Sequence, residues 1–183
     1  MIPEILKVRM SRRKLLQDIA LAVSALVISS TIGCGEENHR KIPEGFDFEF
    51  STELIRLTNQ LRMQNGFNPL KIHLSLTLAA QNYSEVLAQN DYFAHEGPDG
   101  SLPWDRMAAE GFNYNTWKGE NLVKGDIDYD PQGLFDVLVK SEGHKANMLN
   151  PNYKFIGVSC YVRNLSYPIR LCVQEFGGEY TEQ

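Results

Sequence analysis

Two apolar stretches near the end of the chain decide what kind of sheet it can form. They run over about Phe155–Arg163 and Ile169–Phe176 and are separated by the five residues 164–168, which end in a proline. Short apolar runs joined by turn residues are typical of a β-hairpin. Folding the chain about this segment places Cys160 nearly opposite Cys172, so a disulfide across the hairpin is geometrically reasonable. A pair of buried free thiols is the alternative.

The segments before this hairpin have mostly helical spacing. In the first of them, three leucines recur on one helix face after Ser51 and Thr52, either of which can cap the helix. Helices that come first and antiparallel strands that close the domain predict an α+β fold, with helices on both faces of a small sheet. The expected elements are helices over about 51–65, 75–90 and 101–110 and from Pro131 onward, and a short strand over about 117–123.

Residues 1–33 have the composition of a signal peptide that is removed on export. Basic residues over 9–14 precede the mostly apolar segment Ile19–Ile32, which is too short to span a bilayer as a permanent helix. Residues 11–16 resemble a twin-arginine export signal. Met10 is an alternative start of translation.

The signal peptide ends in Ser30–Cys34, which resembles a bacterial lipobox, although Thr31 stands where leucine is usual. We therefore expect a lipid anchor on Cys34 and a place in the cell envelope or outside the cell, with plain secretion as the alternative. Residues 34–50 are polar and irregular and would form a tether. Residues 51–180 would then form one domain, expected to be monomeric.

The charge of the exported part limits its partners. Without residues 1–33 the chain has 13 Lys and Arg against 21 Asp and Glu, which leaves a net charge of −8. A surface this acidic argues against nucleic acid as a partner, because phosphate binding needs basic side chains. Export to an oxidising compartment favours a disulfide between Cys160 and Cys172.

Three residues stand out as candidates for chemistry. His95, Glu120 and His144 each lie in a short stretch with flanking glycines, where backbone and ligand can approach closely. Two imidazoles and a carboxylate can hold a metal ion or transfer protons. The other two histidines, His39 and His73, lack such a setting.

The stretches around these residues resemble the CAP superfamily of cysteine-rich secretory proteins, insect venom allergens and plant pathogenesis-related proteins, and specifically its bacterial SCP-like branch. The resemblance covers roughly residues 51–177 and implies a three-layer α/β/α sandwich. The matching motifs are His95–Gly100, Pro103–Met107, Gly119–Leu122, Ser141–Pro151 with the following Ile156–Val158, and Gln174–Phe176.

The resemblance also implies a site. Eukaryotic members have two histidines and two glutamates in a central cavity, and His95, Glu120 and His144 match three of them. The fourth position is Ser141, and Glu142 is one residue away from it. Some family members bind zinc there, so the resemblance implies His95 and His144 as zinc ligands. Glu120 would either bind the ion or orient a histidine.

Alternative roles for these residues stay open. The trio can instead be a structural hydrogen-bonded network that closes the cavity. In either case Ser141, Asn121 and Glu142 are expected as supporting residues. A hydrolase using Ser141, His144 and Glu120 is an alternative, but Ser141 lacks a nucleophile-elbow sequence and is better explained as a helix cap. Six aromatic residues around the motifs would be mostly core, or would line a groove for a lipid, sterol, glycan or peptide. They are Tyr92, Phe93, Trp104, Phe112, Tyr114 and Trp117. The sequence thus favours a binding module over an enzyme, and the runner-up is a metal-assisted hydrolase acting on peptide or envelope material.

Overall fold

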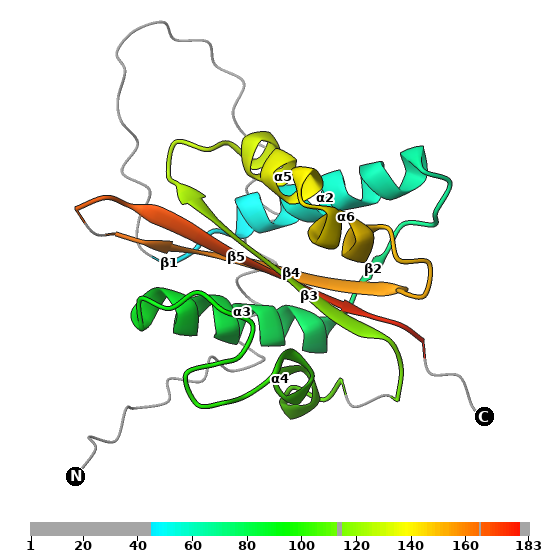
Figure 1. The fold of residues 1–183 in the computed structure, drawn as a ribbon, viewed down its shortest axis with the longest axis horizontal. Coiled ribbons are helices and arrows are strands. Elements are labelled where there is room, and N and C mark those ends of the chain that lie inside the picture. Colours follow the sequence, from blue (N-terminus) through cyan, green and yellow to red (C-terminus); the bar gives the residue numbers. More distant parts are fainter. Residues whose placement is uncertain (1–44, 113–114, 165, 180–183) are drawn as a thin grey trace, which may run out of the picture. The chain divides into compact units, whose positions relative to one another are not determined.

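The computed structural model describes residues 45–112, 115–164 and 166–179. The expected signal peptide, Cys34 and most of the expected tether lie outside these residues. The helices are α2 (Phe48–Gln64), α3 (Leu74–Gln89), α4 (Pro103–Ala109), α5 (Pro131–Lys140) and α6 (Glu142–Met148), and the strands are β1 (Gly45–Phe46), β2 (Lys71–Ile72), β3 (Lys118–Asp126), β4 (Phe155–Arg163) and β5 (Ile169–Gly177) (Figure 1).

The strands form one sheet in the order β1–β4–β5–β3, with antiparallel pairing along this order. β2 joins the sheet by pairing in parallel with the start of β4. β4 and β5 form the predicted hairpin, in which Cys160 stands directly opposite Cys172 and the two sulfur atoms are bonded. Among the described strands β3 pairs with β5 alone, so it forms one edge of the sheet.

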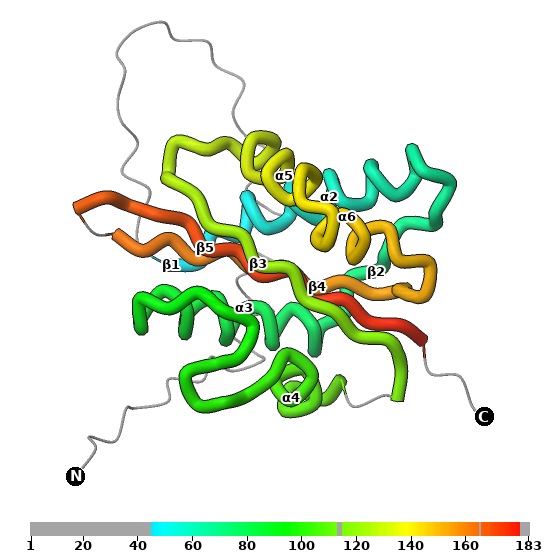
Figure 2. Tube along the Cα trace, viewed as in Figure 1, coloured from blue at the N-terminus to red at the C-terminus, as the bar shows by residue number. Residues whose placement is uncertain are grey.

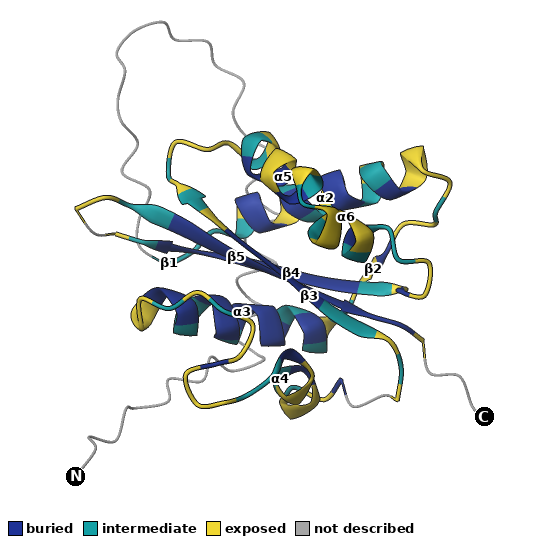
Figure 3. Ribbon diagram, in the orientation of Figure 1, coloured by how far each residue is buried: buried dark blue, intermediate teal, exposed yellow. Residues whose placement is uncertain are grey.

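Helices cover both faces of this sheet. Figure 1 shows α2, α5 and α6 on one face and α3 and α4 on the other, and the Cα trace in Figure 2 has the same layers. Because side chains alternate along β5, Cys172 and Phe176 join the core beneath α2 and α5, whereas Leu171 and Val173 join the core beneath α3. The helix sides that face the sheet are the buried ones (Figure 3). The expected three-layer α/β/α sandwich is confirmed.

The described domain begins before the expected boundary at residue 51. Asp47 caps α2, because its carboxylate accepts a hydrogen bond from the N–H of Phe50 at 3.0 Å. Ser51, an expected cap, instead lies inside the helix, and its hydroxyl accepts from the buried N–H of Cys160 at 2.9 Å. The domain therefore takes up part of the segment 34–50 that we expected to form a tether.

Two other helix starts also differ from the prediction. α3 is capped by His73, whose Nδ1 accepts from the N–H of Ser75 at 3.2 Å. The ring of His73 also contacts the rings of Phe112 and Phe155 edge to face. His73 thus has a structural position under the sheet. α4 starts after Leu102, so the third helix is shorter than predicted.

Helix α3 and strand β4 touch backbone to backbone at Gly157. A Cβ atom at Gly157 would lie 2.2 Å from the carbonyl carbon of Leu76 and 2.2 Å from the nitrogen of Thr77. The missing side chain lets the helix lie close to the sheet. This contact fixes the height of α3 above the sheet face on which Glu120 lies.

Candidate functional site

Glu120 is the centre of the candidate site, and its side chain is buried although it lies on the edge strand β3. The strand turns Glu120 and Leu122 toward α3 and turns Asn121 toward α6. Only 1% of the Glu120 side chain is exposed. Its Oε1 lies 2.7 Å from Nδ1 of His95, and its Oε2 accepts from the guanidinium of Arg106 at 2.7 Å. Both carboxylate oxygens are therefore engaged.

Arg106 ties the loop that carries His95 to the rest of the fold. Its guanidinium donates to the main-chain oxygens of Ser101 at 2.8 Å and of His95 at 3.0 Å, in addition to its ion pair. It also lies over the ring of Tyr83 on α3, with 3.4 Å between its central carbon and the ring centroid. We assigned no role to Arg106 from the sequence, although the motif Pro103–Met107 contains it.

Helix α6 brings His144 to the same edge of the sheet from the opposite face. Ser141 caps α6 as the sequence indicated, because its hydroxyl accepts from the N–H of His144 at 3.5 Å. The amide of Asn121 donates to the main-chain oxygen of His144 at 3.0 Å. The amide of Asn147 donates to the main-chain oxygen of Glu120 at 3.2 Å and to Asn121 at 2.9 Å. These bonds fasten α6 to the edge strand.

The glycine before Glu120 has a packing role. A Cβ atom at Gly119 would lie 2.2 Å from the hydroxyl oxygen of Tyr153. That hydroxyl donates to the main-chain oxygen of Lys118 at 3.1 Å, which holds the start of β3 against the turn after α6. Glu142, expected as a supporting residue, is exposed in the first turn of α6.

The two histidines have opposite pKa shifts. The hydrogen bond with Glu120 raises the pKa of His95 and outweighs the effect of its burial. Burial lowers the pKa of His144, and the nearby His95 lowers it further. The buried Nδ1 of His144 has no hydrogen-bond partner among the described residues. The imidazole of His144 is therefore favoured in its neutral form, beside the imidazole of His95 that Glu120 supports. A neutral imidazole nitrogen can bind a metal cation or accept a hydrogen bond from a ligand.

A second buried carboxyl group faces Glu120, and we did not identify it from the sequence. Glu175 stands opposite Glu120 in the register of β3 and β5 and is fully buried. The carboxyl groups of Glu175 and Glu120 interact, and this interaction favours the protonated form of Glu175. Burial, and next the charge of Glu120, raise the pKa of Glu175 well above its usual range, while Arg106 opposes this shift. The available signal was the alternation along β5, which puts Glu175 on the face of Leu171 and Val173.

Replacing Glu175 by glutamine should remove a loss of stability that the wild-type protein shows as the pH rises. Between an unfolded-state pKa of about 4.5 and the raised folded-state pKa, the unfolded chain has lost its proton while the folded chain keeps it. The free energy of unfolding therefore falls there by up to about 1.4 kcal/mol per pH unit. Urea unfolding from pH 5 to 8 should show a steeper decline for the wild type than for Glu175→Gln. Parallel curves would contradict this assignment.

Comparison with known proteins supports the fold and the motifs. The model of the cysteine-rich secretory protein family (CAP) matches residues 55–176. The chain is 35% identical over 130 residues to YkwD of Bacillus subtilis, an uncharacterised protein, and this match covers 71% of the chain and 48% of YkwD. It is 32% identical over 107 residues to YlbC, an uncharacterised membrane protein of the same species, covering 58% of the chain and 30% of YlbC. The chain thus spans about half or less of these relatives.

Solved structures share the fold. An outer surface protein of Borrelia burgdorferi matches with a TM-score of 0.64 at 22% identity, covering 75% of this chain and 99% of that one. An extracellular protein with an SCP domain from Bacillus anthracis matches with a TM-score of 0.61 at 22% identity, covering 81% of this chain and 45% of that one. At such identities the likeness shows the fold alone. No helix within the described residues is long and apolar enough to cross a membrane.

Proposed function

Since the chain belongs to the CAP family of cysteine-rich secretory proteins, we propose that it is an exported binding module whose ligand-contacting centre is built from His95, Glu120 and His144. The observation that supports this proposal most strongly is the pair of contacts that the Glu120 carboxylate makes. His95 occupies one carboxylate oxygen and Arg106 the other, in a nearly fully buried setting. Glu120 therefore orients an imidazole, and its side chain is too deeply buried to reach a substrate as a general base.

The position of Ser141 supports a binding role over a serine hydrolase. A nucleophilic serine needs its hydroxyl within hydrogen-bond reach of an imidazole nitrogen. The Ser141 hydroxyl instead accepts from the main-chain N–H of His144 at the start of α6. Ser141 is thus a capping residue, and the remaining enzymatic alternative is a metal-assisted hydrolase acting on peptide or envelope material.

Zinc, in this proposal, would be held by the two histidines. With Nδ1 turned to Glu120, His95 has Nε2 left for a ligand, and its side chain is 56% exposed. The buried Nδ1 of His144, which has no hydrogen-bond partner among the described residues, is a second nitrogen that could bind the cation. No group of three His, Cys, Asp or Glu side chains suited to a metal ion exists among the described residues, so binding would be modest. Bound zinc would supply Lewis acidity.

Calorimetric titration of the full chain with zinc tests the metal part of the proposal. We expect the wild type to bind zinc and the His95→Ala/His144→Ala variant to bind it at least tenfold more weakly. Lys145→Ala, an exposed change next to His144, should bind as the wild type does and serves as the control. Equal binding by the double variant, or none by either protein, would contradict a zinc site and leave the histidines as polar ligand contacts.

We further propose that the domain is held at the cell surface by a lipid on Cys34. The lipobox-like stretch before Cys34 supports this. The outer-surface and extracellular descriptions of the two structural neighbours are consistent with export, but not specifically with a lipid. Mass spectrometry of the N-terminal peptide from membrane-fractionated protein tests the anchor, and an unmodified Cys34 with its signal peptide still attached would refute it.

A further inference from the structure

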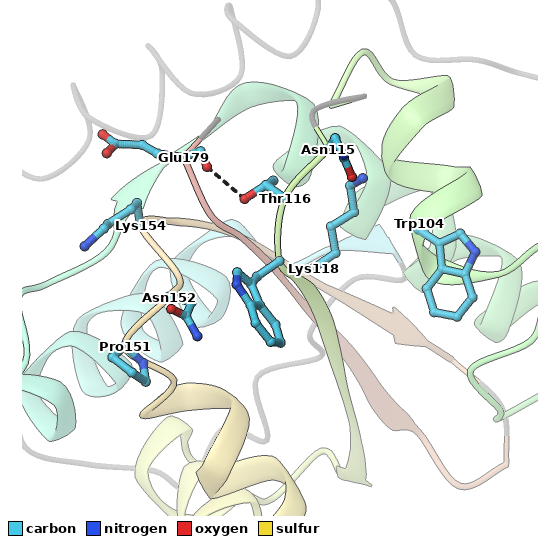
Figure 4. A pocket seen from close by; sticks show the side chains of 9 residues that line it. Trp104, Asn115, Thr116, Lys118, Pro151, Asn152, Lys154 and Glu179 are labelled. Atoms are coloured by element: carbon cyan, nitrogen blue, oxygen red, sulfur yellow. Dashed lines mark hydrogen bonds between the residues drawn. The ribbon is translucent and has the colours of Figure 1, made fainter. Parts of the chain in front are cut away.

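A wide groove lies at the end of the sheet where β3 begins and β5 ends. Its volume is about 780 Å³, and it is open to solvent. In Figure 4 the indole of Trp104 lies at one side, Lys154 and Glu179 lie at the other, and Lys118 lies between them. Trp117 also lines it. The groove therefore joins residues from α4, from the start of β3 and from the turn before β4.

Main-chain contacts build the floor of this groove. The hydroxyl of Thr116 donates to the main-chain oxygen of Glu179 at 2.8 Å (Figure 4). The N–H of Gly178 donates to the main-chain oxygen of Trp117 at 2.9 Å. A Cβ atom at Gly178 would lie 2.5 Å from the hydroxyl oxygen of Thr116 and 2.8 Å from the main-chain oxygen of Asn152, so three chain segments meet closely there. The groove is thus a built feature of the domain.

Both tryptophans of the chain line this groove, and both are exposed. Trp104 is 52% exposed and Trp117 is 62% exposed. Our sequence-based expectation that most of the aromatic cluster is core is wrong: Phe112 is buried and Tyr92 partly so, but Phe93 is exposed like the two tryptophans, and Tyr114 lies outside the described residues. Large exposed indoles offer rigid contact area and are typical of a binding surface.

The other groups that line the groove indicate which class of ligand it would bind. Asn115 and Asn152 carry amides that can both donate and accept, and Lys118 and Lys154 carry positive charge against the single carboxylate of Glu179. This local excess of cations lies on a chain whose formal net charge is −5. A densely charged polyanion such as nucleic acid would be repelled by the whole molecule. A lipid chain would need a closed, apolar lining, and this groove is open to solvent and its lining is about as polar as it is apolar.

We propose that this groove binds an oligosaccharide that carries carboxylate groups. The C–H face of a pyranose ring is apolar and packs flat on an indole, while the ring hydroxyls reach the asparagine amides. Lys154 would pair with a carboxylate of the ligand. The proposal names a ligand class for the binding function proposed above and rests on that function, but it needs no metal at His95 or His144.

Tryptophan fluorescence of the full chain tests the proposal directly, because both tryptophans report from the groove. The probes are a hyaluronan tetrasaccharide, which alternates N-acetylated and carboxylated sugars, and the neutral tetramer of N-acetylglucosamine. We expect saturable binding of the hyaluronan probe. Trp104→Ala and Trp117→Ala should each weaken it at least tenfold. Lys154→Ala should weaken the hyaluronan probe about fivefold and leave the neutral probe unchanged.

The controls distinguish binding in this groove from binding elsewhere on the domain. Tyr167, 85% exposed in the hairpin loop at the other end of the sheet, provides the matched aromatic control, and Tyr167→Ala should bind as the wild type does. Circular dichroism melting confirms that each variant is folded. Absence of saturable binding, or an equal loss of binding in Tyr167→Ala, would overturn the proposal that the ligand binds in this groove. Loss of binding in His95→Ala/His144→Ala with full binding in both tryptophan variants would overturn it too, while leaving the histidine centre intact.

Discussion

Arg106→Ala is expected to destabilise the domain by about 3–5 kcal/mol. The substitution removes the cation that is paired with a carboxylate whose side chain is only 1% exposed, and a buried charge without its partner is among the most costly defects. It also removes donors from two main-chain oxygens of the loop that carries His95, and the stacking on Tyr83. The free energy of unfolding from urea titration at pH 7 measures the loss.

A double variant separates the electrostatic part of this effect from the rest. In Arg106→Ala/Glu120→Gln the carboxylate that needs the guanidinium is gone, so the second substitution should cause much less loss in the Arg106→Ala background than in the wild type. Glu120→Gln alone should also lower the pKa of His95 measured by NMR, because the hydrogen bond that the imidazole makes to the Glu120 carboxylate raises it. Additive losses across the cycle would show that Arg106 and Glu120 are not coupled.

The hairpin is the part of the fold that the sequence predicts best. The expected bounds of β4 match the structure, and those of β5 differ by one residue. Both strands are mostly apolar because helices cover both faces of the sheet, so their limits are set by local turn residues. The first helix is less well predicted, since choosing between Asp47 and Ser51 as its cap requires knowing that β4 passes beside Ser51.

The sequence likewise predicts some residues of the candidate site and misses others. The glycine-rich motifs mark His95, Glu120 and His144, and the structure brings His95 and Glu120 into contact. Arg106 and Glu175 reach the site only through pairing and packing over distances that a motif does not encode. A buried acid on an apolar strand gives a weak signal, because the same spacing would put it in solvent on a half-exposed strand.

Gly157→Ala is expected to destabilise the domain by about 3 kcal/mol or more, at the upper end of the range for overpacking. The new methyl carbon would lie 2.2 Å from two main-chain atoms of α3, at Leu76 and Thr77. A side chain in that place could rotate away, but main-chain atoms can yield only if the helix moves off the sheet. Such a shift would loosen the packing around Tyr83 on the same helix, and with it the Arg106 contact.

Gly143→Ala provides the matched control for this second prediction. Apart from its chain neighbours and the backbone of its own helix α6, nothing lies within 4 Å of the Cβ position at Gly143, so alanine there should be neutral or stabilising by up to about 1 kcal/mol. Urea unfolding of both variants measures the difference, and amide hydrogen exchange along α3 shows whether the helix has moved. If the two glycines tolerate alanine equally, α3 is not held against β4 by the missing side chain, and the height of the helix over Glu120 must be set by its larger apolar contacts with Leu171 and Val173 instead.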